Sequence, residues 1–157
     1  MRPVAVFLTV LVLWVGQALA APALFVPPER QALAVALQGD GTLAVSGRTL
    51  DRDLIRTLYQ KRDFEPIWTE SRTTSFARAL DQAPSHGIEP GPFLVPALSA
   101  LNRELVTTDA FLRYASALAR GRVTPGDIET DWRIAAPSFD PAKVLDLALA
   151  GDMASVL

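Results

Sequence analysis

Apolar residues recur at helical spacing through much of the chain, and the clearest case is the segment 107–120. Its apolar positions fall at i, i+3, i+4 and i+7: Phe111, Tyr114, Ala115 and Leu118. This spacing forms one stripe on a helix. Asp109 near the beginning and Arg120 near the end match the polarity of a helix dipole. The pattern therefore predicts a helix that buries one face and ends at Gly121.

Further helices are predicted on both sides of this one. A short helix is expected over residues 29–37, and a second, capped by Asp51 or Asp53, buries a face composed of Leu54, Ile55, Leu58 and Tyr59. A third begins near Ser71 or Thr74 and carries Phe76, Ala79, Leu80 and Ala83. A fourth is expected over residues 93–105, where Pro96 weakens the first turn. The last runs from Asp140–Pro141, an N-cap followed by a helix-starting proline, to Ala150.

The intervening segments carry few strand signals. Residues 43–45 are expected to be extended, residues 84–92 form a loop rich in Gly and Pro, and Pro125 marks a turn. Residues 152–157 read as the first turn of another helix, which leaves truncation of a longer protein open. We therefore expect residues 21–157 to form a single, mainly α domain of about five to seven helices.

The first twenty residues resemble a signal peptide. Arg2 precedes an apolar run from Val4 to Val15, and Ala18-Leu19-Ala20 provides the small-x-small pattern that precedes cleavage. The run is shorter than the ~20 residues that span a bilayer. The chain contains no cysteine, so a lipoprotein anchor is excluded. We expect an exported, periplasmic protein without a stable membrane anchor after cleavage.

Composition limits the chemistry. The 157 residues carry 15 Lys and Arg against 17 Asp and Glu, and the loss of Arg2 would make the net charge of −2 more negative. Such a chain has no basic footprint for nucleic acid. One histidine and no cysteine make a Cys–His nucleophile impossible and a metal site improbable. We therefore expect no catalytic residue, no cofactor and no metal.

Several single residues allow specific predictions. His86, next to Ser85, is expected to stabilise a turn, and Glu70 to lie exposed or cap a helix, although a carboxylate is also what glycan cleavage needs. Asp109 and Arg113 stand four apart and predict a surface ion pair. Five aromatics are expected in the core: Tyr59, Phe64, Phe76, Phe111 and Tyr114. Two tryptophans are open between core packing, a partner interface and contact with a sugar: Trp68 and Trp132.

Three motifs occur in a specific order. The first is Leu58-Tyr59-x-x-Arg62-x-Phe64-x-Pro66-x-Trp68. The second is Ala79-Leu80-x-x-Ala83-x-x-His86-Gly87-Ile88-x-Pro90. The third is Thr108-Asp109-Ala110-Phe111-Leu112-Arg113-Tyr114-Ala115 with Gly121-Arg122-Val123-x-Pro125. Together they resemble the N-terminal scaffold region of YcbB-type murein L,D-transpeptidases, over about residues 51–135.

The resemblance implies a helical domain that supports a catalytic domain. In that family a peptidoglycan-binding module and a transpeptidase domain follow, and the latter carries a His-x-Gly and a Ser-x-Gly-Cys segment. Neither segment occurs here. The resemblance therefore implies a non-catalytic scaffold, either a fragment or a stand-alone protein. Its partner would be a transpeptidase catalytic domain or another envelope protein. A stand-alone peptidoglycan-binding module is the main alternative, and a small murein hydrolase using Glu70 is the third.

Overall fold

The computed structural model describes residues 26–120, 139–151 and 153–157. The expected signal peptide over residues 1–20, the turn at Pro125 and Trp132 lie outside these residues. Of the described helices, none combines the length and the apolar character needed to cross a bilayer.

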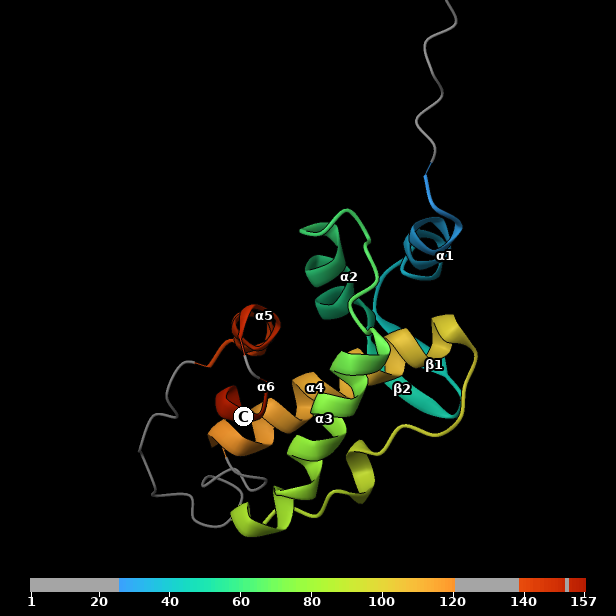
Figure 1. Ribbon diagram of the computed structural model, residues 1–157. Helices are drawn as coiled ribbons and strands as arrows, with labels where there is room; N and C mark the ends of the chain where they lie inside the picture. Colours follow the sequence, from blue (N-terminus) through green and yellow to red (C-terminus); the bar gives the residue numbers. More distant parts are fainter. Residues whose placement is uncertain (1–25, 121–138, 152) are drawn as a thin grey trace, which may run out of the picture.

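Helices dominate the described part of the chain, as the sequence predicts (Figure 1). The α-helices are α1 (Pro28–Ala36), α2 (Arg52–Gln60), α3 (Glu70–Asp81), α4 (Ala100–Arg120), α5 (Pro141–Ala150) and α6 (Met153–Val156). Two short 3-10 helices, η1 (Ala83–His86) and η2 (Gly91–Phe93), lie within the segment expected to be a loop or beside it. The expectation of a mainly α domain is confirmed.

A small antiparallel hairpin precedes α2. Its strands are β1 (Thr42–Val45) and β2 (Arg48–Asp51), with Leu43 opposite Leu50. Ser46 and Gly47 between them have φ values of 49° and 77°, and positive φ at both central residues is characteristic of a type I′ hairpin turn. The extended character expected for residues 43–45 is confirmed, whereas β2 was not predicted.

Helix α4 lies at the centre of the fold. It packs against α1, α2, the hairpin, η2 and α5, and it crosses behind α3 in Figure 1. The prediction of a separate helix over residues 93–105 is wrong. Residues 94–99 are not helical, because Pro96 opposes a helix there, and a single helix runs from Ala100 onward. Nothing between Leu105 and Thr107 breaks that helix.

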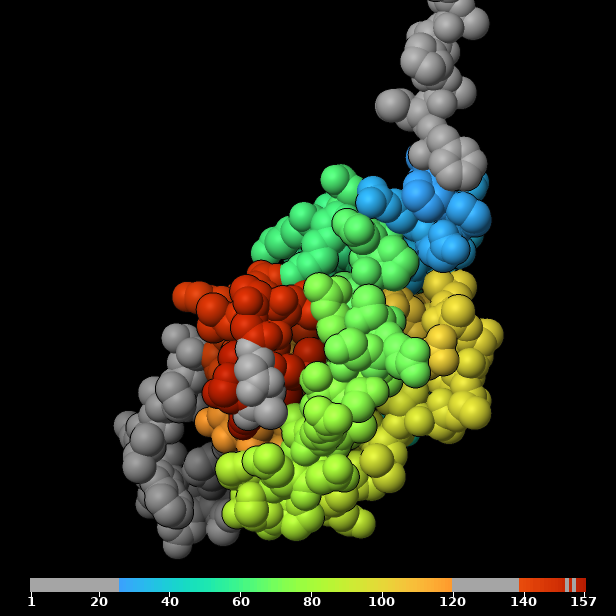
Figure 2. All heavy atoms as spheres, viewed as in Figure 1, coloured from blue at the N-terminus to red at the C-terminus, as the bar shows by residue number. Residues whose placement is uncertain are grey.

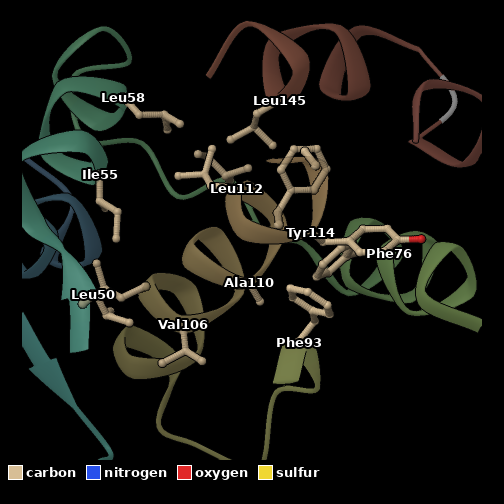
Figure 3. Close-up of a cluster of buried hydrophobic side chains, with 14 of the residues drawn as sticks. Leu50, Ile55, Leu58, Phe76, Phe93, Val106, Ala110, Leu112, Tyr114 and Leu145 are labelled. Atoms are coloured by element: carbon tan, nitrogen blue, oxygen red, sulfur yellow. The ribbon is translucent and has the colours of Figure 1, made fainter. Parts of the chain in front are cut away.

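The core surrounds α4 on most sides. Figure 3 shows labelled core side chains from the hairpin, α2, α3, η2 and α5 gathered around those of α4. The predicted stripe is buried at Phe111, Tyr114 and Ala115, while Leu118 is half-buried. The buried surface of α4 is wider than predicted, since it also includes Leu105, Val106, Ala110 and Leu112. Helix α4 is thus a central helix rather than a surface helix with one buried face.

Side-chain caps fix where three of the helices begin. Asp51 Oδ1 accepts from the Leu54 N–H at 3.0 Å, which selects Asp51 over Asp53 as the cap of α2. Thr69 caps α3 by accepting from the Arg72 N–H at 3.3 Å, so α3 begins at Glu70, earlier than predicted. Asp140 Oδ1 accepts from the Ala142 N–H at 3.0 Å, as its N-cap pattern predicts.

Candidate functional site

A buried carboxylate, Glu104, joins three segments of the fold. Its residue is only 7% exposed on α4. Its Oε1 atom accepts from the Tyr59 hydroxyl at 2.7 Å and from the Ile67 N–H at 2.5 Å. The Trp68 N–H lies 3.3 Å from both oxygens. An ionised carboxylate only accepts hydrogen bonds, which matches this set of donors. Glu104 therefore holds the end of α2 and the following turn against α4.

Thr108, one turn after Glu104, extends this network. Trp68 donates its indole Nε1–H to Thr108 Oγ1 at 2.8 Å, and Tyr59 Oη lies 2.9 Å from the same atom. Thr108 Oγ1 is also 2.9 Å from the Glu104 carbonyl oxygen, to which it can donate. We call these four residues the Glu104 network: Tyr59, Trp68, Glu104 and Thr108. A hydrogen-bonded polar cluster of this kind favours one arrangement of the surrounding elements.

The environment of the network disfavours a charge on its tyrosine. Tyr59 is fully buried. Burial, together with the negative charge of Glu104, raises the pKa of the Tyr59 phenol well above its ordinary value of 10.0. Tyr59 therefore remains a hydrogen-bond donor to Glu104 across the physiological pH range.

The turn after α2 directs Trp68 toward α4. Asp63 and Phe64 have φ values of 50° and 57°, which side chains other than glycine seldom adopt. The Phe64 N–H donates to the Tyr59 carbonyl at 2.9 Å and ends the helix. Phe64 is only half-buried, so the prediction of a core position for it holds in part.

Two arginines brace this turn from the outside. Arg62 forms an ion pair with Asp146 of α5, and Arg72 donates from Nη1 to the Ile67 carbonyl at 2.8 Å. The Trp68 ring packs on Phe76 and Phe111, with centroids 5.6 and 5.9 Å away. The motif that ends at Trp68 thus forms a rigid corner of the fold.

A groove of about 400 Å³ lies beside the Glu104 network. Its lining comes from α1, from the turn before α3 and from the beginning of α4: Pro28, Glu29, Ala32, Leu33, Pro66, Trp68, Ala100, Leu101, Arg103 and Glu104. In Figure 2, α1 (blue), the green segment after α2 and the gold beginning of α4 border one another on one face. A groove of this size and apolar character is typical of a binding site for a small group.

The second buried acid, Asp109, faces the hairpin. Its Oδ2 atom is 2.8 Å from Arg113 Nε, which confirms the predicted pair. The expectation that this pair lies at the surface is wrong for its acid, because Asp109 is only 6% exposed. Arg113 also donates to the Thr49 carbonyl at 2.7 Å and so ties β2 to α4. Burial raises the pKa of the Asp109 carboxyl, and Arg113 opposes that shift.

The structure separates the other residues weighed as candidates. Glu70 is exposed in the first turn of α3, where an acid favours the helix dipole. His86 is exposed at the end of η1, and Gly87 with φ of 70° ends that turn. Ser85 Oγ donates to the Gln82 carbonyl at 2.7 Å. The described residues contain no cluster of His, Asp or Glu that could hold a metal ion.

Sequence reasoning missed Glu104 and assigned no role to the hydroxyl of Thr108. Glu104 fell inside the wrongly placed helix over residues 93–105, where an acid reads as a solvent-facing position. Its donors lie 45 and 37 positions away in the chain, at Tyr59 and Ile67. The one usable signal in the sequence came from the donors rather than from Glu104. A tyrosine or tryptophan that is expected in the core needs a hydrogen-bond partner there, so Tyr59 and Trp68 predict a polar residue near them.

The comparison with protein families gives a match that covers most of the described chain. The family model described as a scaffold domain matches residues 53–157, which include all of α2 except Arg52, the whole of α3 to α6 and the whole Glu104 network. The searches of curated proteins and of solved structures found no match. Because the family model covers more than half of the chain, this protein belongs to the scaffold domain family.

Proposed function

We propose that this protein is a non-catalytic scaffold domain of an exported peptidoglycan cross-linking system, in which it supports an L,D-transpeptidase catalytic domain. The family match supports the scaffold role. The relation to L,D-transpeptidases is supported by the three ordered motifs. Among the residues that the structure describes, which exclude the end of the third motif, the three motifs pack against one another, and this packing is the observation that carries the proposal.

Direct contacts join the motifs. Tyr59 and Trp68 of the first motif contact the Thr108 hydroxyl of the third. Tyr114 of the third donates from its hydroxyl to the Ala79 carbonyl of the second at 3.2 Å. These motif residues therefore hold segments of the fold together, and a stable fold is what a scaffold requires. The absence of cysteine is consistent with this role, because the transpeptidase nucleophile is a thiol.

The test is reconstitution. The purified protein is mixed with the catalytic fragment of a murein L,D-transpeptidase that lacks its own scaffold region, and cross-linked muropeptides are counted by chromatography. We expect the protein to raise the melting temperature of the fragment and the yield of cross-links. A Phe111→Ala variant, which disrupts the core, is the matched negative control. A fragment whose stability and activity are unchanged by the wild-type protein would contradict the proposal.

Incubation with murein alone tests the non-catalytic part of the proposal. We expect no new muropeptides. Products that disappear in a Glu70→Gln variant would instead identify a hydrolase that uses this exposed acid.

Export has its own test. After expression in a Gram-negative host, we expect the protein in the periplasmic fraction with its first residue at Ala21, as measured by mass spectrometry of the intact chain. Recovery of an uncleaved chain in the cytoplasm would overturn this part of the proposal and leave the scaffold role intact.

The groove supports a second candidate, a peptidoglycan-binding module. Trp68 is half-buried and lines the groove, so the part of its ring not packed on Phe76 and Phe111 can meet a ligand. Sedimentation with purified sacculi tests this directly. Binding that survives Trp68→Phe and Trp68→Ala equally well would count against a role for that ring.

A further inference from the structure

The groove beside α1 combines an apolar lining with an unusual arrangement of charge. Two acids and one base line it: Glu29, Glu104 and Arg103. Glu29 belongs to α1 and Arg103 is exposed at the groove's edge, while Glu104 is buried in its wall. The α1 side of the groove precedes residues 53–157, so the groove as a whole is not a feature of the family match.

Glu104 has no cationic partner among the described residues. Its donors are a phenol and two backbone N–H groups, and no ion pair of the described chain includes it. Within the described part of the chain its two oxygens are used unequally, because Oε1 accepts from Tyr59 and Ile67, while Oε2 has only the Trp68 N–H at 3.3 Å, which it shares with Oε1. A carboxylate offers about four acceptor positions. Acceptor capacity therefore remains on Oε2.

We infer that this groove binds an alkylammonium group of the lysine type, presented by a peptide segment of the scaffold's partner, with the charge directed to Glu104. A buried carboxylate without a counterion gains most from a cation that enters its low-dielectric surroundings. This inference deepens the proposed function, on which the identity of the partner rests. Binding of the amine itself does not depend on that identity.

The lining fits the rest of such a side chain. The aliphatic stem of a lysine can lie along Pro66, Leu101 and Ala32, since long charged side chains bury their methylene groups against apolar surface. The indole of Trp68 lines the same groove, and an aromatic face attracts an ammonium group. The indole N–H is already used by Thr108, so any contribution of this ring to binding comes from its π-system rather than from its donor.

The first test uses small probes on the whole purified protein. Nα-acetyl-lysine methylamide is titrated while the indole N–H resonance of Trp68, assigned by its loss in Trp68→Phe, is followed by NMR. We expect a saturable shift with a Kd on the order of 1 mM, as a ligand of this size allows. The Nε-acetylated probe, which has the same stem without the charge, should bind ~10-fold more weakly. Equal binding of both probes, or no saturation with either, overturns the inference.

Two variants separate this site from the fold. Glu104→Gln keeps an acceptor for Ile67 and Trp68 but removes the charge, and we expect it to lose ~10-fold or more in affinity. Arg103→Gln removes the competing cation from an exposed position and should tighten binding ~2-fold without affecting folding. Arg78→Gln, an exposed change on α3 away from the groove, is the matched control and should bind as wild type does. If Arg103→Gln binds no better than Arg78→Gln, the inference fails even where Glu104→Gln does not fold.

The reconstitution experiment remains separate from these titrations. Loss of amine binding with intact support of the catalytic fragment would overturn only this inference. Intact amine binding without such support would overturn the proposed function instead.

Discussion

Two buried acids on one helix are accommodated in different ways. Glu104 and Asp109 of α4 are 7% and 6% exposed. Glu104 is surrounded by neutral donors from α2 and from the turn that follows it. Asp109 relies on the guanidinium of Arg113, whose side chain is 58% exposed. The contacts of Glu104 join separate segments inside the core, whereas Asp109 pairs with a charged side chain that also contacts the hairpin.

The difference separates rigid from adjustable parts of the domain. Removal of the Glu104 side chain leaves several buried donors without an acceptor, and each unpaired donor lowers the free energy of unfolding. The Asp109–Arg113 pair is exposed on one side, so water and salt screen it. We therefore expect the corner around Trp68 to carry much more of the stability than the attachment of the hairpin.

Helix α4, which carries the two acids, also provides an apolar reference. Phe111 is fully buried and contacts Trp68 and Phe76. We expect Phe111→Ala to lower the free energy of unfolding by ~3–5 kcal/mol, because it removes a ring and leaves a cavity. Urea denaturation followed by circular dichroism measures the loss. An unchanged midpoint would show that this face of α4 is not in the core.

The comparison is tested most directly at Glu104. Glu104→Ala should cost about 3 kcal/mol, because the Ile67 and Trp68 N–H groups and the Tyr59 hydroxyl lose their acceptor in the interior. Glu104→Gln retains an acceptor oxygen and should cost clearly less. Denaturation of both variants in parallel provides the check. Equal losses would mean that the charge, rather than the hydrogen bonds, stabilises this corner.

A smaller effect is expected at the hairpin. Arg113→Ala removes the partner of Asp109 and the bond to the Thr49 carbonyl, and we expect a loss of about 1 kcal/mol. Amide hydrogen exchange should show faster exchange in the hairpin and little change at Ile67 and Trp68. A loss as large as that of Glu104→Ala would erase the distinction between the two acids.

The smallest effect is the pH dependence of Asp109. Its pKa is raised above the ordinary value of 3.8, chiefly by burial, with Arg113 and Arg48 opposing the shift and Asp51 adding to it. A raised pKa means that Asp109 contributes stability below its unfolded pKa and loses it as the pH rises through the folded value. Relative to Asp109→Asn, the wild type should therefore lose stability as the pH rises from below 3.8 through the raised pKa of Asp109. A relative gain over that range would show that Arg113 outweighs burial.

Local signals predicted the fold well where one residue decides the outcome. The pair Asp140–Pro141 begins α5 as its cap requires. The hairpin had a comparable signal in Ser46–Gly47, but β2 is only four residues long and carries Arg48 and Asp51, which obscured its strand pattern. The prediction that a helix begins at residue 93 is wrong because the apolar residues Phe93 and Leu94 are the last residue of η2 and the residue that follows it.

The candidate site was less accessible to sequence reasoning. The sequence locates the aromatic and proline turn, and it leaves Trp68 open between core packing, a partner interface and contact with a sugar. In the structure its ring packs on Phe76, as the core alternative predicts, and it also lines the groove. Glu104 could not be placed, because its environment exists only after α2 and α4 have come together. The role of a buried acid depends on partners that are remote in sequence.

That remoteness bears on the order in which the domain forms. The bond from Tyr59 to Glu104 closes a chain interval of 45 positions, so it follows the formation of local structure. We expect α4 to become helical early while Glu104 is still hydrated, and to give up that water only when α2 docks. The corner around Trp68 therefore forms late in folding. If α2 docks incorrectly, Glu104 loses its water without gaining donors, and this cost in free energy disfavours the incorrect arrangement.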